Sequence, residues 1–136
     1  MVEIIAGKKG KGKTKYLLDK VNTSVESASG NIVYLDKSQK HMHELSNKVR
    51  LINVGDYPIS NCDEFLGFIS GIISRDFDIT NIFVDGIFKI VGSDNLDGFE
   101  SFLNRLETMS QKFEITFVIS VSIDAETAPD YIKKLA

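Results

Sequence analysis

The sequence of 136 residues contains one cysteine, no long apolar run and no excess of basic residues. A single cysteine, Cys62, excludes an internal disulfide and a cysteine-rich metal site. No segment approaches the ~18 consecutive apolar residues of a membrane-spanning helix, and the apolar start of the chain is too short for a signal peptide. We therefore expect a reduced, cytoplasmic setting and no membrane partner.

The balance of charge gives no sign of a nucleic-acid partner. Lysine and arginine together number 16, aspartate and glutamate 19, and the formal net charge is -3. Domains that bind nucleic acid usually carry a basic excess, so we do not expect this partner. The apolar content of 43% is sufficient for a hydrophobic core. The sequence shows no repeat or linker, which predicts a single domain over residues 1–136.

Stretches typical of strands alternate along the chain with stretches typical of helices. The strand-like stretches are residues 2–6, 31–36, 50–54, 81–85 and 114–121. The helical stretches are residues 14–22, 60–75 and 94–112, with a short helix expected after Pro129. This alternation predicts an α/β fold, a three-layer α/β/α sandwich around a mainly parallel five-stranded sheet. Ligands of such sheets bind beyond the carboxyl ends of the strands.

Residues 7–14, GKKGKGKT, satisfy the pattern G-x-x-x-x-G-K-[ST] between a strand and a helix. Glycines let the backbone turn tightly, so that successive N–H groups and the helix N-terminus attract phosphate. We expect Lys13 to reach the β- and γ-phosphates and Thr14 to bind Mg²⁺. The remaining lysines either strengthen this attraction or form a solvated basic rim. The predicted nucleotide-binding set is Gly7, Lys8, Lys9, Gly10, Lys11, Gly12, Lys13, Thr14 and Lys15.

A second motif, IFVDG at residues 82–86, reads as a buried strand that ends in Asp85. A protein that holds Mg²⁺–nucleotide on such a loop needs a second carboxylate near the metal. We therefore predict Thr14 and Asp85 as the metal-binding residues.

With these two motifs the chain resembles the P-loop nucleoside triphosphatases over nearly its full length. Residues 7–14 look like a Walker A loop, and residues 82–85 look like a Walker B strand. The order of elements is similar to the RecA-like branch, which implies that the strand at residues 114–121 lies between the strands of the two motifs. The chain also looks like a short ATP-binding protein family of Gram-positive anaerobes. The resemblance implies ATP and Mg²⁺ as ligands.

One position departs from the pattern of the RecA-like branch. That branch commonly has a glutamate after the Walker B aspartate to polarise the attacking water, whereas this chain has Gly86. Carboxylates or hydroxyls at other strand ends could substitute, namely Asp36, Asp56, Ser120 or Ser122, although turn chemistry explains each of them as well. We predict Lys13, Asp36, Asp85 and Ser120 as the catalytic residues.

Three other features are weaker signals. His41 and His43 could be read as metal ligands, but the sequence shows no third ligand nearby, so a solvated or loop role is favoured, with contact to a substrate or the γ-phosphate as an alternative. Cys62 lies in the first turn of a helix, which can lower a thiol pKa, and we interpret it as structural. The guanine-reading N/T-K-x-D element is absent after the last strand, which favours ATP over GTP.

The leading hypothesis is an Mg²⁺-dependent ATP-binding protein with slow or partner-activated hydrolysis. The alternatives are a small nucleoside-type kinase and a switch or interaction module that does not hydrolyse nucleotide. Residues 2–6 are expected to form an edge strand, and exposed edges invite pairing. We therefore predict that the C-terminal tail, another copy of the chain or a partner protein covers this edge.

Overall fold

The computed structural model describes residues 1–10 and 12–136, and Lys11 lies outside the described residues. Five strands pair in parallel in the order β1-β5-β4-β2-β3. The strands are β1 (Val2–Gly7), β2 (Asn31–Asp36), β3 (Val49–Asn53), β4 (Ile79–Asp85) and β5 (Thr116–Ser122). The strand that follows β4 in the chain thus lies between β1 and β4, as the resemblance implied.

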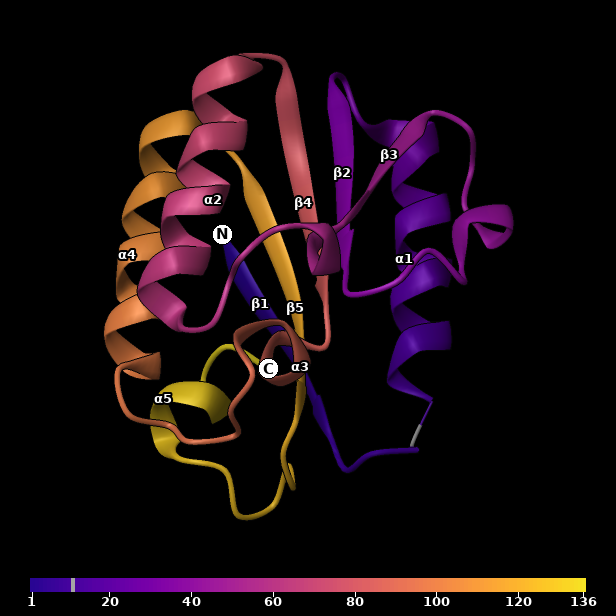
Figure 1. The fold of residues 1–136 in the computed structure, drawn as a ribbon. Helices are drawn as coiled ribbons and strands as arrows, with labels where there is room; N and C mark the ends of the chain where they lie inside the picture. Colours follow the sequence, from indigo (N-terminus) through magenta and orange to yellow (C-terminus); the bar gives the residue numbers. More distant parts are fainter. Residues whose placement is uncertain (11) are drawn as a thin grey trace.

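Helices cover both faces of this sheet, which confirms the predicted three-layer α/β/α fold (Figure 1). Helix α1 (Lys13–Ser27) covers one face, and α2 (Cys62–Arg75) and α4 (Phe99–Phe113) cover the other. The short helices α3 (Ile87–Val91) and α5 (Asp130–Lys133) lie near the lower end of the sheet in this view. Two 3₁₀ turns, η1 (Met42–Glu44) and η2 (Val54–Asp56), flank β3 in the chain.

The apolar strands form a separate hydrophobic core on each face of the sheet. One core packs the sheet against α1 and includes Leu17, Tyr34 and Phe83. The larger core lies under α2 and α4, where Phe65 and Phe102 stack with ring centroids 6.0 Å apart. Because the central strands are buried on both faces, their sequences are nearly continuous apolar runs.

Side chains set the start of α2. The Asn61 side chain accepts a hydrogen bond of 2.8 Å from the Glu64 backbone N–H, and Glu64 in turn accepts one of 2.7 Å from the Ser60 N–H. This reciprocal arrangement satisfies backbone donors that a helix N-terminus otherwise leaves free. Asn61 is thus the N-cap of α2.

The helix expected at residues 94–112 begins later than predicted. Gly98 adopts φ +77°, and α4 begins at Phe99. In the preceding loop, the Ser93 and Asn95 side chains accept hydrogen bonds from backbone N–H groups two residues further on. Such local bonds compete with helix formation. Helix α3, which follows β4 after Gly86, was not predicted from the sequence.

The predicted edge strand is present, and the C-terminal tail covers part of it. Strand β1 has β5 as its single neighbour in the sheet of the described residues. On its outer side, the Ile4 N–H donates a hydrogen bond of 2.8 Å to the Leu135 carbonyl. Ile132, in α5, is fully buried and anchors this tail. Of the coverings predicted for the edge, the tail is therefore confirmed.

Candidate functional site: a phosphate loop beside paired aspartates

The predicted phosphate loop connects the end of β1 to the start of α1. Gly7 is the last residue of β1, and Gly12 occupies the N-cap of α1 in the left-handed region, with φ +77°. Among the described residues, no side chain caps this helix. Its first backbone N–H groups therefore have no intrahelical or capping partner, which is the arrangement that binds phosphate at a helix N-terminus.

Lys13 lies at the first position of α1 and extends over the loop. Its ammonium group donates a hydrogen bond of 2.9 Å to the Lys8 carbonyl. Burial lowers the pKa of the Lys13 ammonium group. The negative charge of Asp85 opposes this shift, and the positive charge of Lys89 adds to it. The ammonium group thus lies close enough to both residues to sense their charge. The bond to the Lys8 carbonyl ties the lysine side chain to the backbone of the loop.

Asp85 is the centre of a hydrogen-bond network at the end of β4. One carboxylate oxygen, Oδ1, accepts from the hydroxyls of Thr14 and Ser120, each at 3.3 Å. The other oxygen, Oδ2, accepts a bond of 2.7 Å from the Tyr34 hydroxyl. Burial and this bond raise the pKa of Tyr34 above its ordinary value, so the phenol stays protonated and acts as a donor. Asp85 is itself 9% exposed.

Ser120 links β5 to the turn after β4. It is buried, and its hydroxyl accepts a hydrogen bond of 2.8 Å from the Gly86 backbone N–H while it contacts Asp85. Gly86 has φ +75°, a conformation that strains any residue with a side chain. The backbone at position 86 therefore disfavours the glutamate found there in the RecA-like branch.

Asp36 lies directly beside Asp85, because the two residues are paired in register on the neighbouring strands β2 and β4. Asp36 is 8% exposed, and its side chain contacts the Ser38 hydroxyl at 3.4 Å. Burial, followed by the charge of Asp85, raises the pKa of Asp36 above its ordinary value. Of the alternatives at the strand ends, Asp36 and Ser120 are thus the two that the fold brings to Asp85.

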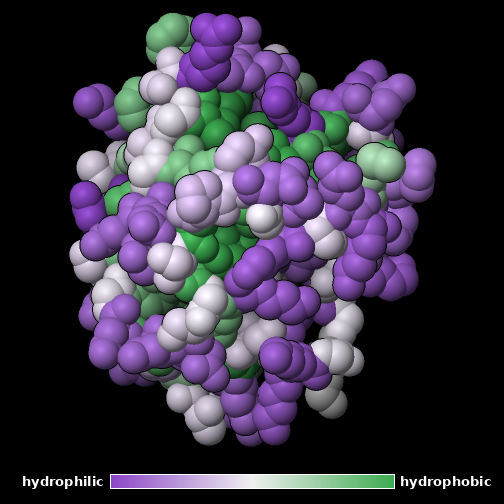
Figure 2. Space-filling model, in the orientation of Figure 1, coloured by the Kyte–Doolittle hydropathy of each residue, from purple (hydrophilic) through white to green (hydrophobic). Residues whose placement is uncertain are grey.

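Lys13, Thr14, Asp85 and Ser120 line an open pocket of about 390 Å³, whereas Asp36 and Tyr34 are not among its lining residues. Its lining comes from the loop, the end of β4, α3 and the end of β5, namely Lys9, Gly10, Gly12, Lys13, Thr14, Asp85, Gly86, Lys89, Ser120 and Ser122. A second pocket of about 380 Å³ adjoins it and shares Lys9, Gly86, Lys89 and Ser122. At the lower end of the molecule, hydrophilic residues are interspersed with residues of intermediate hydropathy (Figure 2).

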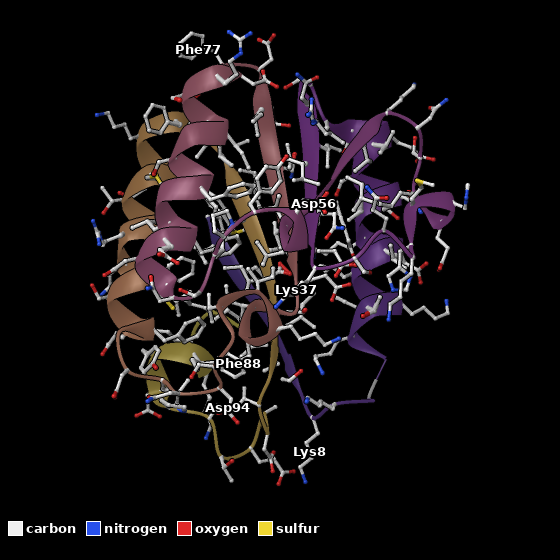
Figure 3. All side chains as sticks on the ribbon, viewed as in Figure 1. Lys8, Lys37, Asp56, Phe77, Phe88 and Asp94 are labelled. Carbon is white, nitrogen blue, oxygen red and sulfur yellow. The ribbon has the colours of Figure 1, made fainter. Side chains whose placement is uncertain are left out.

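Two residues of this site were missed by the sequence analysis. Lys89 reaches the pocket from α3, a helix that the sequence did not predict. Its carbonyl accepts a bond of 3.3 Å from Lys37, which lies beside α3 in Figure 3. Tyr34 reads in the sequence as one apolar residue of a buried strand, and only the register of β2 against β4 brings its hydroxyl to Asp85.

Three predicted binding or catalytic candidates have other partners. Lys8 forms an ion pair of 3.5 Å with Asp124 at the lower end of the molecule (Figure 3). Lys15 pairs with Asp19 of its own helix at 3.2 Å, and its side chain is 82% exposed. Asp56 lies in η2, is exposed and contacts Asn53 at 3.5 Å. Neither the Lys15 nor the Asp56 side chain takes part in the network around Asp85.

The structure also bears on the interpretations of Cys62 and His41 that were drawn from the sequence. Burial and the charge of Asp63 raise the pKa of the Cys62 thiol, so its position in the first turn of α2 does not make it acidic. His41 has two acidic neighbours in space, Asp36 and Asp85, and one potential ligand atom from each of the three lies within 4.8 Å of the others. The expectation that no further ligand lies near His41 was therefore wrong.

Comparison with known proteins supports the fold and leaves the function open. No family model and no curated protein matches the sequence. Among solved structures, the chain is similar to a KaiC-like protein of the hyperthermophilic archaeon Pyrococcus horikoshii, with a TM-score of 0.66 and 15% identity. The match covers 98% of this chain and 67% of the archaeal one. At 15% identity, the likeness to this structure establishes a shared α/β fold with a parallel five-stranded sheet.

No helix within residues 1–10 and 12–136 has the length and apolar character needed to cross a membrane.

Proposed function

We propose that the protein binds Mg²⁺–ATP through the loop at residues 7–14 and hydrolyses it slowly. The observation that carries this proposal is the convergence of Lys13, Thr14, Asp85 and Ser120 around one pocket at the carboxyl ends of parallel strands. Binding at this edge is the general rule for such sheets. The resemblance of residues 7–14 to a Walker A loop and the KaiC-like fold of the structural neighbour point the same way.

The residues at the pocket fit a phosphate chain and a magnesium ion. Free N–H groups at the start of α1 and the Lys13 ammonium group would hold the β- and γ-phosphates. The Thr14 hydroxyl and the Asp85 carboxylate lie 3.3 Å apart, and both are oxygen ligands of the kind that Mg²⁺ takes. When bound, Mg²⁺ would neutralise charge that develops on the phosphate oxygens.

Hydrolysis requires a group that orients and deprotonates water, and we assign this role to Asp36. Gly86 has no side chain to do so, whereas the Asp36 carboxylate is paired in register with Asp85 on the neighbouring strand and lies close to it. Ser120 would position the turn at Gly86, through its bond to the Gly86 N–H. Without a glutamate at position 86, we expect turnover to be slow unless a partner supplies a further group.

Titration of labelled ATP with and without Mg²⁺ tests the binding proposal. We expect saturable binding that Lys13→Ala abolishes and that Thr14→Ala makes independent of Mg²⁺. For hydrolysis, Asp36→Asn should lower kcat by about a hundredfold or more while ATP binding persists. Asp56→Asn is the matched control, because this carboxylate is exposed and accepts its hydrogen bond from Asn53, away from the Asp85 network. Equal ATP binding by wild type and Lys13→Ala would refute the proposal.

The adjoining pocket favours a second candidate, transfer of the γ-phosphate to a small acceptor. This pocket also contains Phe88, Ser93 and Asp94, of which Figure 3 labels Phe88 and Asp94 on the same side of the molecule. An acceptor bound there would lie next to the phosphate loop, because the two pockets share Lys9 and Lys89. ATP consumption that begins only when nucleosides or other hydroxyl acceptors are added would support this kinase activity over hydrolysis.

A further inference from the structure

Three groups that commonly bind metal ions converge beside the proposed nucleotide site. Asp36 and Asp85 end the neighbouring strands β2 and β4, and His41 precedes η1. One potential ligand atom of each residue lies within 4.8 Å of the other two. Separations of this size allow one ion, at about 2.0–2.2 Å from each ligand, to contact all three after small side-chain movements.

A carboxylate orients the histidine in this group. The Nδ1 atom of His41 lies 2.9 Å from Glu44 Oε1, and the imidazole side chain is only 18% exposed. A carboxylate on one ring nitrogen is the arrangement that fixes the tautomer and ring position of metal-bound histidines. It leaves Nε2 of His41 as the ring nitrogen that is available to a ligand.

The two aspartates leave negative charge that no cation in the described chain pairs with directly. Both are more than nine-tenths buried, and neither forms an ion pair with a described Lys, Arg or His. Lys13, which is close enough to sense Asp85, donates its hydrogen bond to the Lys8 carbonyl instead. Two adjacent buried carboxylates are costly unless a positive charge compensates them.

We propose that Asp36, His41 and Asp85 form a binding site for a divalent first-row transition metal ion such as Mn²⁺ or Zn²⁺. An imidazole with two carboxylates suits these ions, whereas Mg²⁺ prefers oxygen ligands alone. The site shares Asp85 with the proposed Mg²⁺–ATP site and Asp36 with the proposed hydrolytic machinery, but it does not need nucleotide. Its ligands come from β2, β4 and the segment before η1, so the bound ion would join that segment to the sheet.

Metal titration of the full chain, stripped with chelator and free of nucleotide, tests the site. Co²⁺ serves as the optical probe, because its visible absorption reports imidazole ligation, and Mn²⁺ is followed by electron paramagnetic resonance. We expect one ion per chain, with affinity reduced about tenfold or more in His41→Ala. The matched control is His43→Ala, because this histidine is exposed and lies only two residues away.

Further variants distinguish this proposal from the one for ATP. Asp36→Asn should weaken metal binding without unfolding the chain, because it removes like-charge repulsion, and Glu44→Gln should weaken it through the orientation of His41. Lys13→Ala should lose ATP binding and keep Co²⁺ binding. The proposal is overturned if the wild type binds no Co²⁺ or Mn²⁺ without ATP, or if His41→Ala binds them as tightly as His43→Ala does.

Discussion

At the scale of the residue, the candidate site is built on a few polar side chains in an apolar setting. Asp85 accepts hydrogen bonds from three hydroxyls, those of Thr14, Tyr34 and Ser120. Three neutral donors hold the carboxylate in one position without neutralising it. A bound cation would therefore find Asp85 already oriented, which reduces the free energy needed to order the site.

The first prediction concerns Tyr34, whose fully buried hydroxyl donates to Asp85 at 2.7 Å. Tyr34→Phe removes that donor and leaves a carboxylate oxygen poorly satisfied. We expect the free energy of unfolding to fall by about 2 kcal/mol in urea denaturation, with weaker Mg²⁺–ATP binding. Tyr16→Phe is the control, because Tyr16 is 56% exposed. An equal effect of both substitutions would contradict the role of the bond.

The second prediction concerns Gly86, whose φ of +75° is costly for any residue with a Cβ. Installing the missing glutamate with Gly86→Glu should destabilise the protein by about 1 kcal/mol, and Gly86→Ala should cost a similar amount. Neither should increase ATP hydrolysis, because the new side chain starts from a strained backbone. Thermal melts and phosphate release measure both effects, and faster turnover in Gly86→Glu would disprove the expectation.

At the scale of the element, local side-chain chemistry decides where helices begin. The pattern of apolar residues at helical spacing runs through both α2 and the stretch before α4. Asn61 starts α2 where the pattern starts, whereas Gly98 and the polar side chains of Ser93 and Asn95 delay α4. Periodicity therefore locates the buried face of a helix better than it locates the first residue.

The third prediction tests the cap of α2. Asn61→Ala removes the acceptor of the Glu64 N–H, and we expect a loss of about 1 kcal/mol in the free energy of unfolding. Asn47→Ala provides a matched control, because this asparagine is exposed and lies in a turn between η1 and β3. Chemical denaturation of the two variants gives the comparison. If Asn61→Ala is as stable as Asn47→Ala, the cap is unimportant.

At the scale of the whole molecule, the strand order brings the functional residues together and leaves β1 at an edge. The order β1-β5-β4 places Ser120 between the phosphate loop and Asp85. The same order leaves the outer side of β1 without a neighbouring strand. The tail that contains α5 covers this edge through the bond between Ile4 and Leu135, and Tyr131 packs near Phe99 with ring centroids 6.5 Å apart.

The fourth prediction tests this edge. The Ile4 amide should exchange with solvent more slowly than an uncovered edge amide, because its hydrogen is bonded to the Leu135 carbonyl. Deletion of the tail from residue 129 should speed that exchange and cause concentration-dependent self-association, since an open apolar edge invites pairing. Hydrogen exchange and light scattering measure the two effects. A deletion variant that stays monomeric with a protected Ile4 amide would contradict the prediction.

The sequence by itself determined the α/β class, the approximate strands and the resemblance of residues 7–14 to a phosphate loop. These features depend on residues that are close in the chain, where apolar period and glycine spacing are directly visible. It also singled out Asp36, Asp85 and Ser120, because each ends a strand-like stretch. Their roles in binding and catalysis stay predictions.

Only the tertiary structure decided which of these groups meet. The register of β2 against β4 sets Asp36 beside Asp85 and brings the Tyr34 hydroxyl to Asp85, while Asp56 stays apart on η2. The chain path before η1 brings His41 to the same pair. Strand register and loop path are long-range properties, set by the packing of whole faces of the sheet. They have no signature in the residues adjacent to any one of these side chains.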